Sequence, residues 1–213
     1  MSYWGANILP QRLNKILELS NKDDHLLDFG CGQGAYTYHL KNFDYKIKGS
    51  DILKYDQWKN NDFFEQLYKL PLNYPDNLFD VIFCFEVLEH CSDYISLLQE
   101  LNRICRREFI LSVPNCDLDN LLRGANLVPA HWTDQTHCNF FTKKSITEIL
   151  MSNNFSIVTI EDCLEISVSE FFWKTLKVPN IFRKLGAKIT RDFKLSPTFY
   201  SSILIHCKKD KKS

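Results

Sequence analysis

Two carboxylates and an imidazole stand close together in the segment EVLEH, residues 86–90. Glu86, Glu89 and His90 are spaced i, i+3 and i+4, which predicts one shared face of a helical turn. Such side chains can bind a divalent cation, and an imidazole can also act as a general base. A further histidine, His137, lies in the segment HWTDQTHCNFFT (131–142) and could join them. The alternative is a structural role, in which Glu86 and His90 only cap the turn and pack against their neighbours.

A second set of residues suited to chemistry lies in the segment LLDFGCGQGAY, residues 26–36. Its alternating glycines allow a sharp turn and a close approach of a ligand, and a following helix would offer free N–H groups. Asp51 follows about twenty residues later, where a carboxylate can accept hydrogen bonds from the hydroxyls of a ribose. The spacing G-x-G-x-G departs from the G-x-G-x-x-G of dinucleotide sites, so it favours an adenosine-type ligand over a nicotinamide cofactor. On its own, the glycine segment could also be no more than a tight turn.

The surrounding hydrophobic pattern predicts alternating strands and helices. We expect helices over 9–19, 33–43, 93–105 and 143–153, and strands over 25–29, 45–51, 79–86, 108–115, 155–163 and 200–207. The ambiguous residues 57–67 are assigned to a helix, 116–140 to a long loop, and 169–194 to further helical material. This alternation indicates an α/β, doubly wound, Rossmann-like and mostly parallel sheet. Such sheets bind ligands at the carboxyl ends of their strands, which is where both sets of candidate residues fall.

Composition narrows the class of protein. The 213 residues with 45% hydrophobic content predict one globular domain over 1–213, with an N-terminal helix in 1–24, a substrate loop at 116–140 and a lid or insertion at 169–194. Lys and Arg (26) balance Asp and Glu (26), so no nucleic acid partner is expected. We expect a cytoplasmic protein, because no apolar run reaches the ~20 residues of a membrane span and no signal peptide is recognisable. The eight cysteines form no CxxC pair and are interpreted as reduced thiols.

Three motifs together resemble the class I S-adenosylmethionine-dependent methyltransferases over about residues 25–160: LLDFGCGQGAY, SDI (50–52) and FDVIFCFEVLEH (79–90). The resemblance implies a seven-stranded sheet whose last strand, 200–207, is antiparallel, and S-adenosyl-L-methionine as the cofactor.

The same resemblance implies a set of cofactor-binding residues. They are Asp28, Gly30, Gly32, Asp51, Ile52, Gln66, Phe85 and Glu86. The first three would line the methionine part of the cofactor, Asp51 would bind the ribose, and Ile52 would pack on the adenine. Either Gln66 or Glu65 falls where relatives often contact the adenine amino group. Phe85 and Glu86 would lie beneath the sulfonium.

The arrangement Glu-x-x-Glu-His, followed by His-x-x-aromatic-aromatic-Thr, resembles the small-RNA 2′-O-methyltransferases. Similar Glu-x-x-Glu-His stretches occur in ubiquinone-biosynthesis O-methyltransferases. The first resemblance implies that Glu86, Glu89, His90 and His137 bind a divalent metal such as Mg or Mn. Without a metal, His137 or His90 would remain the general base. We therefore expect an O-methyltransferase whose catalytic residues are His137, His90 and Glu86.

The segment HWTDQTHCNFFT also looks like loops of bacterial methyltransferases that modify surface polysaccharides or their precursors. The expected acceptor is therefore a small molecule, a sugar or a nucleotide-linked or phosphate-bearing sugar. The alternatives are a quinone-type or other small aromatic acceptor, or a catalytically inactive cofactor-binding partner subunit. Residues 171–194 carry seven Lys or Arg against one Asp, interleaved with aromatic residues. This segment could be a solvated lid, could hold an anionic substrate, or could contact an anionic membrane surface.

Overall fold

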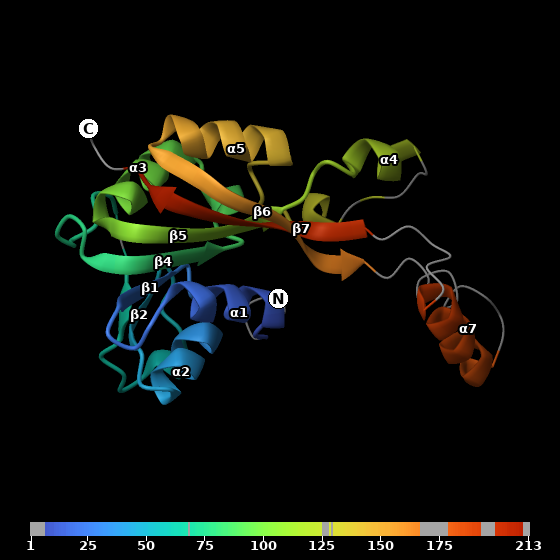
Figure 1. Ribbon diagram of the computed structural model, residues 1–213, viewed down its shortest axis with the longest axis horizontal. Coiled ribbons are helices and arrows are strands. Elements are labelled where there is room, and N and C mark those ends of the chain that lie inside the picture. Colours follow the sequence, from blue (N-terminus) through green and yellow to red (C-terminus); the bar gives the residue numbers. More distant parts are fainter. Residues whose placement is uncertain are drawn as a thin grey trace.

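The computed structural model describes residues 7–67, 69–124, 128, 130–166, 179–192 and 199–210. At its centre lies a seven-stranded sheet in the order β3-β2-β1-β4-β5-β7-β6 (Figure 1). The strands are β1 (His25–Phe29), β2 (Lys46–Asp51), β3 (Phe64–Gln66), β4 (Phe79–Phe85), β5 (Cys105–Pro114), β6 (Phe155–Ile166) and β7 (Phe199–Lys209). β7 runs antiparallel to both β5 and β6. The neighbouring strands β3, β2, β1, β4 and β5 are all parallel to one another. The predicted Rossmann-like α/β fold with an antiparallel last strand is confirmed.

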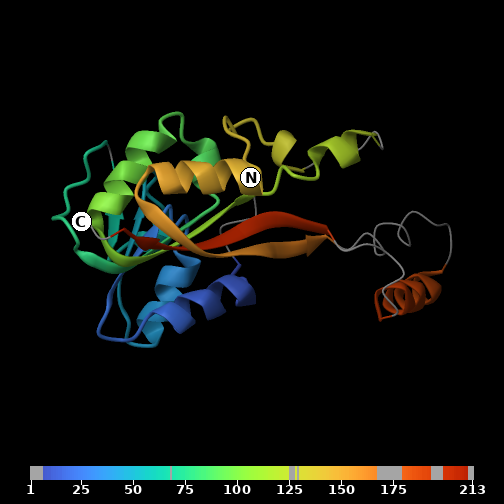
Figure 2. The same cartoon turned by 45° about the horizontal axis from the view of Figure 1, so that its top comes forward.

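Helices cover both faces of the sheet. They are α1 (Pro10–Leu19), α2 (Ala35–Asn42), α3 (Tyr94–Ile104), α4 (Asp119–Gly124), α5 (Lys143–Ser152) and α7 (Asn180–Asp192), with 3-10 turns η2 (Asp56–Trp58), η3 (Leu88–His90) and η4 (Ala130–Trp132). α1 and α2 lie on one face and α3 and α5 on the other, whereas α7 lies apart from these layers (Figures 1 and 2). None of the helices among the described residues combines the length and the hydrophobicity of a membrane span.

Two hydrophobic clusters hold these layers together. Ile16 of α1 and Leu40 of α2 pack with Val81 of β4 in one cluster. Leu98 of α3 and Leu150 of α5 belong to the other. β4 is buried along nearly its whole length, as expected for a central parallel strand covered on both faces. This strand carries the EVLEH turn at its carboxyl end.

One helix prediction and one loop prediction need correction. Residues 57–67 are not a helix, because η2 is followed by strand β3. The ring of Phe64 stacks on Trp58 with centroids 4.9 Å apart, and its backbone pairs with Gly49 of β2. These long-range contacts outweigh the weak local helical pattern. Residues 116–140, predicted as a loop, contain α4 and η4.

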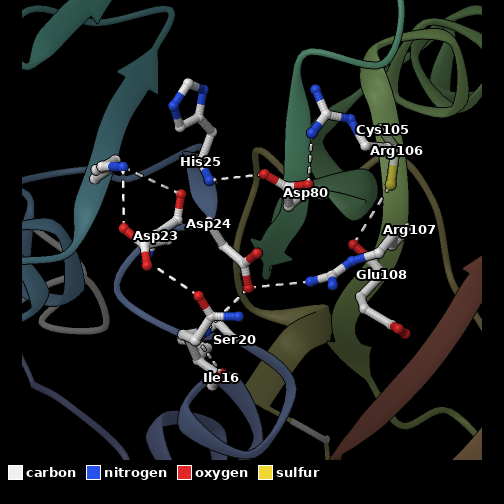
Figure 3. A network of polar contacts seen from close by, with 12 residues as sticks. Ile16, Ser20, Asp23, Asp24, His25, Asp80, Cys105, Arg106, Arg107 and Glu108 are labelled. Atoms are coloured by element: carbon white, nitrogen blue, oxygen red, sulfur yellow. Dashed lines mark hydrogen bonds and ion pairs between the residues drawn. The ribbon is translucent and has the colours of Figure 1, made fainter.

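A polar network ties the strands together at the amino edge of the sheet (Figure 3). The His25 backbone N–H donates to Asp80 Oδ2 (2.9 Å), and Arg106 Nη1 donates to Asp80 Oδ1 (2.9 Å). Arg107 Nη2 donates to Asp24 Oδ2 (3.0 Å). The starts of β1, β4 and β5 are therefore joined by paired groups, whereas the candidate site residues gather at the opposite, carboxyl edge.

Candidate active site

The glycine turn after β1 has room for a ligand at one position. Gly30 and Gly32 both adopt positive φ (+75° and +54°), which favours glycine. A Cβ at Gly30 would overlap the side chain of Val87, so this glycine lets the turn pack against the EVLEH segment. A Cβ at Gly32 would meet no atom within 4 Å. Gly32 therefore faces open space in which a ligand can approach the backbone.

Asp51 joins the glycine turn to the end of β2. Its Oδ2 accepts a hydrogen bond from the Gly32 N–H (2.9 Å), and its Oδ1 accepts one from the Leu53 N–H (3.0 Å). Each oxygen keeps a lone pair for a further donor, such as a ribose hydroxyl. Beside it, Ile52 is 71% exposed, and Gln66 Nε2 donates to the Ile52 carbonyl (3.0 Å). An exposed apolar side chain, a carboxylate and open backbone fit the adenosine part of S-adenosylmethionine.

Asp28 stabilises the same glycine turn through a buried hydrogen bond. It is 4% exposed, and Thr37 Oγ1 of α2 donates to its Oδ2 (2.7 Å). Burial raises the pKa of Asp28 to about 7. In the structure this carboxyl connects β1 to α2, so it holds the turn that would carry the methionine part of the cofactor.

Glu86 does not share a helical face with Glu89 and His90, and that prediction is wrong. The Glu86 backbone takes a positive φ (+53°), and its N–H donates to the Ser112 carbonyl of β5 (2.9 Å). This hydrogen bond keeps Glu86 at the strand tip, so η3 starts only at Leu88. The side chain consequently points to a different set of partners.

A partly buried ion pair contains the Glu86 carboxylate. Glu86 Oε1 pairs with Arg12 of α1 and accepts hydrogen bonds from Ser112 Oγ (2.9 Å) and Ser202 Oγ (2.8 Å). The Arg12 guanidinium also lies 5.0 Å from the ring centroid of Phe85. Glu86 therefore fixes the end of β4 against α1, β5 and β7, and the group of possible metal ligands that includes Glu89 does not include it.

Arg12, Ser112 and Ser202 were not among the residues singled out from the sequence. Arg12 did carry a signal, because it lies four residues before Ile16 on the apolar face of the helix 9–19. An arginine on a buried helix face requires a buried acidic partner. The two serines carried no comparable signal, since serine is common within strands and at their ends.

Glu89, His90 and His137 do come together. Each offers one ligand atom, and these atoms all lie within 4.8 Å of one another. The rings of His90 and His137 have centroids 4.5 Å apart, and His90 Nδ1 lies 2.9 Å from Thr136 Oγ1. Three of the four predicted metal ligands thus form a cluster at the carboxyl edge of the sheet.

The segment that carries His137 is held against η3 by hydrogen bonds to backbone carbonyls. The N–H groups of Cys138 and Asn139 donate to the Glu89 carbonyl at 2.8 and 3.1 Å. Asn139 Nδ2 donates to the carbonyls of Leu88 (3.0 Å) and Cys91 (2.7 Å). These bonds explain why His137, forty-seven positions after His90 in the sequence, lies beside it.

Several buried polar atoms of the Glu89 cluster lack hydrogen-bond partners among the described residues. Glu89 is 1% exposed, and neither of its side-chain oxygens has a hydrogen-bond partner among the described residues. The buried His137 Nδ1 also lacks one within that part of the chain.

Burial, together with the nearby Glu86 charge, raises the pKa of Glu89 to about 9. Burial and the nearby His90 lower the pKa of His137. Buried polar atoms without partners are rare, and a divalent cation would satisfy all of these atoms in place of a proton.

Comparison with known proteins shows the family of this chain. Residues 3–160 match a family model described as a methyltransferase domain. An uncharacterised protein of Methanocaldococcus jannaschii is 34% identical over 111 residues, covering 51% of this chain and 48% of that protein. A tRNA U34 carboxymethyltransferase of Sulfurimonas denitrificans is 31% identical over 112 residues, covering 47% of this chain and 36% of that enzyme. The chain thus spans about half or less of the length of these two relatives.

The fold has a clear counterpart among solved structures. A SAM-dependent methyltransferase from Archaeoglobus fulgidus superposes with a TM-score of 0.67 at 18% identity, covering 93% of this chain and 92% of that one. The family match extends over most of the chain and contains the glycine turn, Asp51 and the EVLEH turn. The chain therefore belongs to the methyltransferase-domain family and has the fold of the S-adenosylmethionine-dependent methyltransferases.

Proposed function

We propose that this enzyme methylates a hydroxyl of a sugar or nucleotide-linked sugar, and that Glu89, His90 and His137 hold a divalent cation that binds this hydroxyl. One observation carries the proposal: the buried Glu89 carboxyl has two unpartnered oxygens, and two imidazoles lie beside it. Because Val87 packs against Gly30 of the cofactor turn, the cluster stands next to the cofactor end of the sheet.

The residues of the chain provide orientation and a proton acceptor. S-adenosylmethionine supplies a methyl group on a positively charged sulfur, so that an O–C bond forms as the S–C bond breaks. The enzyme must align the acceptor oxygen with that bond. A divalent cation held by Glu89, His90 and His137 would lower the pKa of the bound hydroxyl, whose proton would then pass to solvent. Without a cation, His137, whose pKa is lowered by burial and the nearby His90, could accept that proton instead.

An exposed aromatic pair in the segment that also carries His137 suits a polyol. Trp132 and Phe140 stack with ring centroids 3.9 Å apart, and each is 39% exposed. The Arg123 guanidinium lies 4.5 Å from the Trp132 ring centroid, where it could also contact a phosphate. Aromatic faces next to a few polar groups match a sugar ring, which has apolar C–H faces and hydroxyl edges. The same aromatic pair favours the second candidate, a quinone-type or catechol acceptor.

The test is methyl transfer from labelled S-adenosylmethionine to a panel of acceptors. The panel contains nucleotide-linked sugars, free sugars and catechols, each with Mg²⁺ or Mn²⁺ and with a chelator. We expect label in a sugar acceptor, loss of transfer on chelation and in Glu89→Gln, and full transfer in the control Glu148→Gln on the exposed side of α5. Label in catechols alone would support the aromatic acceptor instead. Transfer that survives both chelation and Glu89→Gln would exclude the metal, and no label in any acceptor would favour an inactive cofactor-binding subunit.

A further inference from the structure

A second group of metal-ligating side chains lies outside the Glu89 cluster. Cys116 follows β5, Asp119 is the first residue of α4, and His131 lies in η4. His131 Nε2 is 3.5 Å from Cys116 Sγ and 3.0 Å from Asp119 Oδ1. One ligand atom from each residue lies within 4.8 Å of the other two. The set shares no residue with the Glu89 cluster and has no part in the proposed methyl transfer.

The spacing of these atoms is that of a tetrahedral zinc site. Zinc binds sulfur at about 2.3 Å, imidazole nitrogen at about 2.0–2.1 Å and carboxylate oxygen at about 2.0–2.2 Å. In a tetrahedron, these bond lengths place sulfur and nitrogen about 3.5 Å apart, and nitrogen and oxygen about 3.3 Å apart. The observed separations of 3.5 Å and 3.0 Å come close to both values. A zinc ion could therefore enter with only small shifts of the side chains.

The Asp119 carboxylate gives a second, independent indication. Asp119 is 8% exposed, and its Oδ2 accepts a hydrogen bond from Trp132 Nε1 (2.5 Å). His131 Nε2 lies 3.0 Å from Asp119 Oδ1 and 3.2 Å from Oδ2, so the imidazole and the carboxylate face each other. In many metal sites, an outer group such as the Trp132 N–H orients the carboxylate ligand toward the metal.

We propose that Cys116, Asp119 and His131 bind a zinc ion, whose fourth position is taken by water. Zn²⁺ replaces the thiol proton of Cys116, which passes to solvent as the sulfur–zinc bond forms. The thiolate selects zinc over Mg²⁺ or Mn²⁺, the ions expected at the oxygen- and nitrogen-rich Glu89 cluster.

The zinc site would fix the loop that carries the acceptor surface. Its ligands come from the end of β5, from α4 and from η4, and the Cys116 N–H donates to the Phe141 carbonyl (3.0 Å). Trp132, which binds Asp119, also stacks on Phe140. A zinc ion here would therefore hold the Trp132 ring in place as well as join the three segments.

Cobalt titration tests the site without any methyl acceptor. Co²⁺ replaces zinc in tetrahedral sites, and a thiolate ligand gives a sulfur-to-cobalt charge-transfer band that oxygen and nitrogen ligands do not give. We expect this band at one equivalent in the full chain and its loss when Zn²⁺ is added. It should disappear in Cys116→Ser, weaken in Asp119→Asn and remain in the control Cys91→Ser, with circular dichroism confirming that each variant is folded.

The same titration separates this inference from the proposed function. Glu89→Gln and His137→Ala should retain the thiolate band even though they lose methyl transfer. Trp132→Phe removes the hydrogen bond to Asp119, and we expect it to weaken Zn²⁺ binding by about 10–100-fold, measured by competition with a chromophoric chelator. A wild-type protein without the band, or a band that persists in Cys116→Ser, would overturn the zinc site.

Discussion

At the scale of single residues, Asp51 is the strongest candidate for binding the cofactor ribose. Its two oxygens already accept hydrogen bonds from Gly32 and Leu53, and both keep capacity for hydroxyl donors. Removing a charged acceptor of two hydrogen bonds costs about 1.5–3 kcal/mol for each. We therefore expect Asp51→Ala to weaken S-adenosylhomocysteine binding by on the order of 100-fold or more in calorimetric titration. The exposed Asp56→Ala serves as the control, and unchanged affinity in Asp51→Ala would remove the ribose assignment.

His137 is the residue whose loss should separate cofactor binding from catalysis. It lies in the Glu89 cluster and contacts no residue of the glycine turn in the described part of the chain. In protein preloaded with S-adenosylhomocysteine, we expect calorimetry to show Mn²⁺ binding to the wild type and not to His137→Ala. The variant should keep its affinity for S-adenosylhomocysteine and lose turnover. Mn²⁺ is the suitable probe because it prefers oxygen and nitrogen ligands to the thiolate of Cys116.

Two outcomes would contradict this prediction. Equal Mn²⁺ binding by the wild type and His137→Ala would place the ion elsewhere, and retained turnover would remove His137 from the reaction. Thr136→Val, which removes the hydroxyl contacts with His90 and Asp134 and no proposed metal ligand, provides the matched control. It should keep Mn²⁺ binding within about 10-fold of the wild type, because Thr136 would act only as an outer partner of a ligand.

At the scale of elements, helices and strands with a strong hydrophobic pattern were predictable from the sequence. Elements that depend on contacts with distant residues were not. β1, β4 and α3 follow directly from apolar runs and helical spacing, and the structure confirms them. β3 has only three residues and depends on the stacking of Phe64 and on pairing with β2, which no local pattern records. The positive φ of Glu86 was equally hidden, because it results from the hydrogen bond to Ser112 rather than from residue type. The structure brings Glu89, His90 and His137 together, and it places the Glu86 carboxylate among other partners.

α7 is an amphipathic element whose apolar side is exposed. Ile181, Phe182, Leu185 and Ile189 are 73%, 58%, 55% and 44% exposed. At helical spacing they form one stripe, which the exposed Lys184 and Lys188 flank. We propose that this stripe lies on an anionic lipid surface, since apolar residues flanked by lysines match acyl chains beneath acidic headgroups. Residues 171–178, 193 and 194 belong to the same basic segment of the sequence, 171–194, and lie outside the described residues.

Vesicle sedimentation tests the role of α7. We expect the full chain to bind vesicles that contain phosphatidylglycerol, with binding reduced by salt and nearly absent with phosphatidylcholine alone. Leu185→Asp should reduce binding at least about 10-fold, because it places a negative charge in the apolar stripe. Leu17→Asp, an exposed apolar position on α1, is the matched control and should bind like the wild type. Binding that is equal in Leu185→Asp and the wild type would exclude α7 as the contact.

At the scale of the whole molecule, the two edges of the sheet differ in how their polar groups are satisfied. The amino edge is closed by paired groups such as Asp80 with Arg106 and Asp24 with Arg107 (Figure 3). The carboxyl edge holds the buried Glu89 carboxyl, whose two oxygens lack hydrogen-bond partners among the described residues. Unsatisfied groups lower the stability of the ligand-free protein, and ligands that bind only the folded state restore it. The alternation of strands and helices was readable from the sequence, but this difference between the two edges becomes visible only in the folded structure.

The pH dependence of global stability gives the last prediction, and it depends on Asp28. Its pKa is about 7 in the folded protein, against 3.8 for an exposed carboxyl, so the folded state retains a proton that the unfolded state releases. The free energy of unfolding should therefore fall as the pH rises between about 4 and 7, by at most about 1.4 kcal/mol per pH unit from this group. Asp28→Asn cannot lose the proton, so urea unfolding of the ligand-free variant at pH 5, 6 and 7 should show a correspondingly flatter decline than the wild type. The exposed Asp23→Asn should retain the wild-type decline, and parallel curves for Asp28→Asn and the wild type would show that Asp28 is already ionised throughout this range.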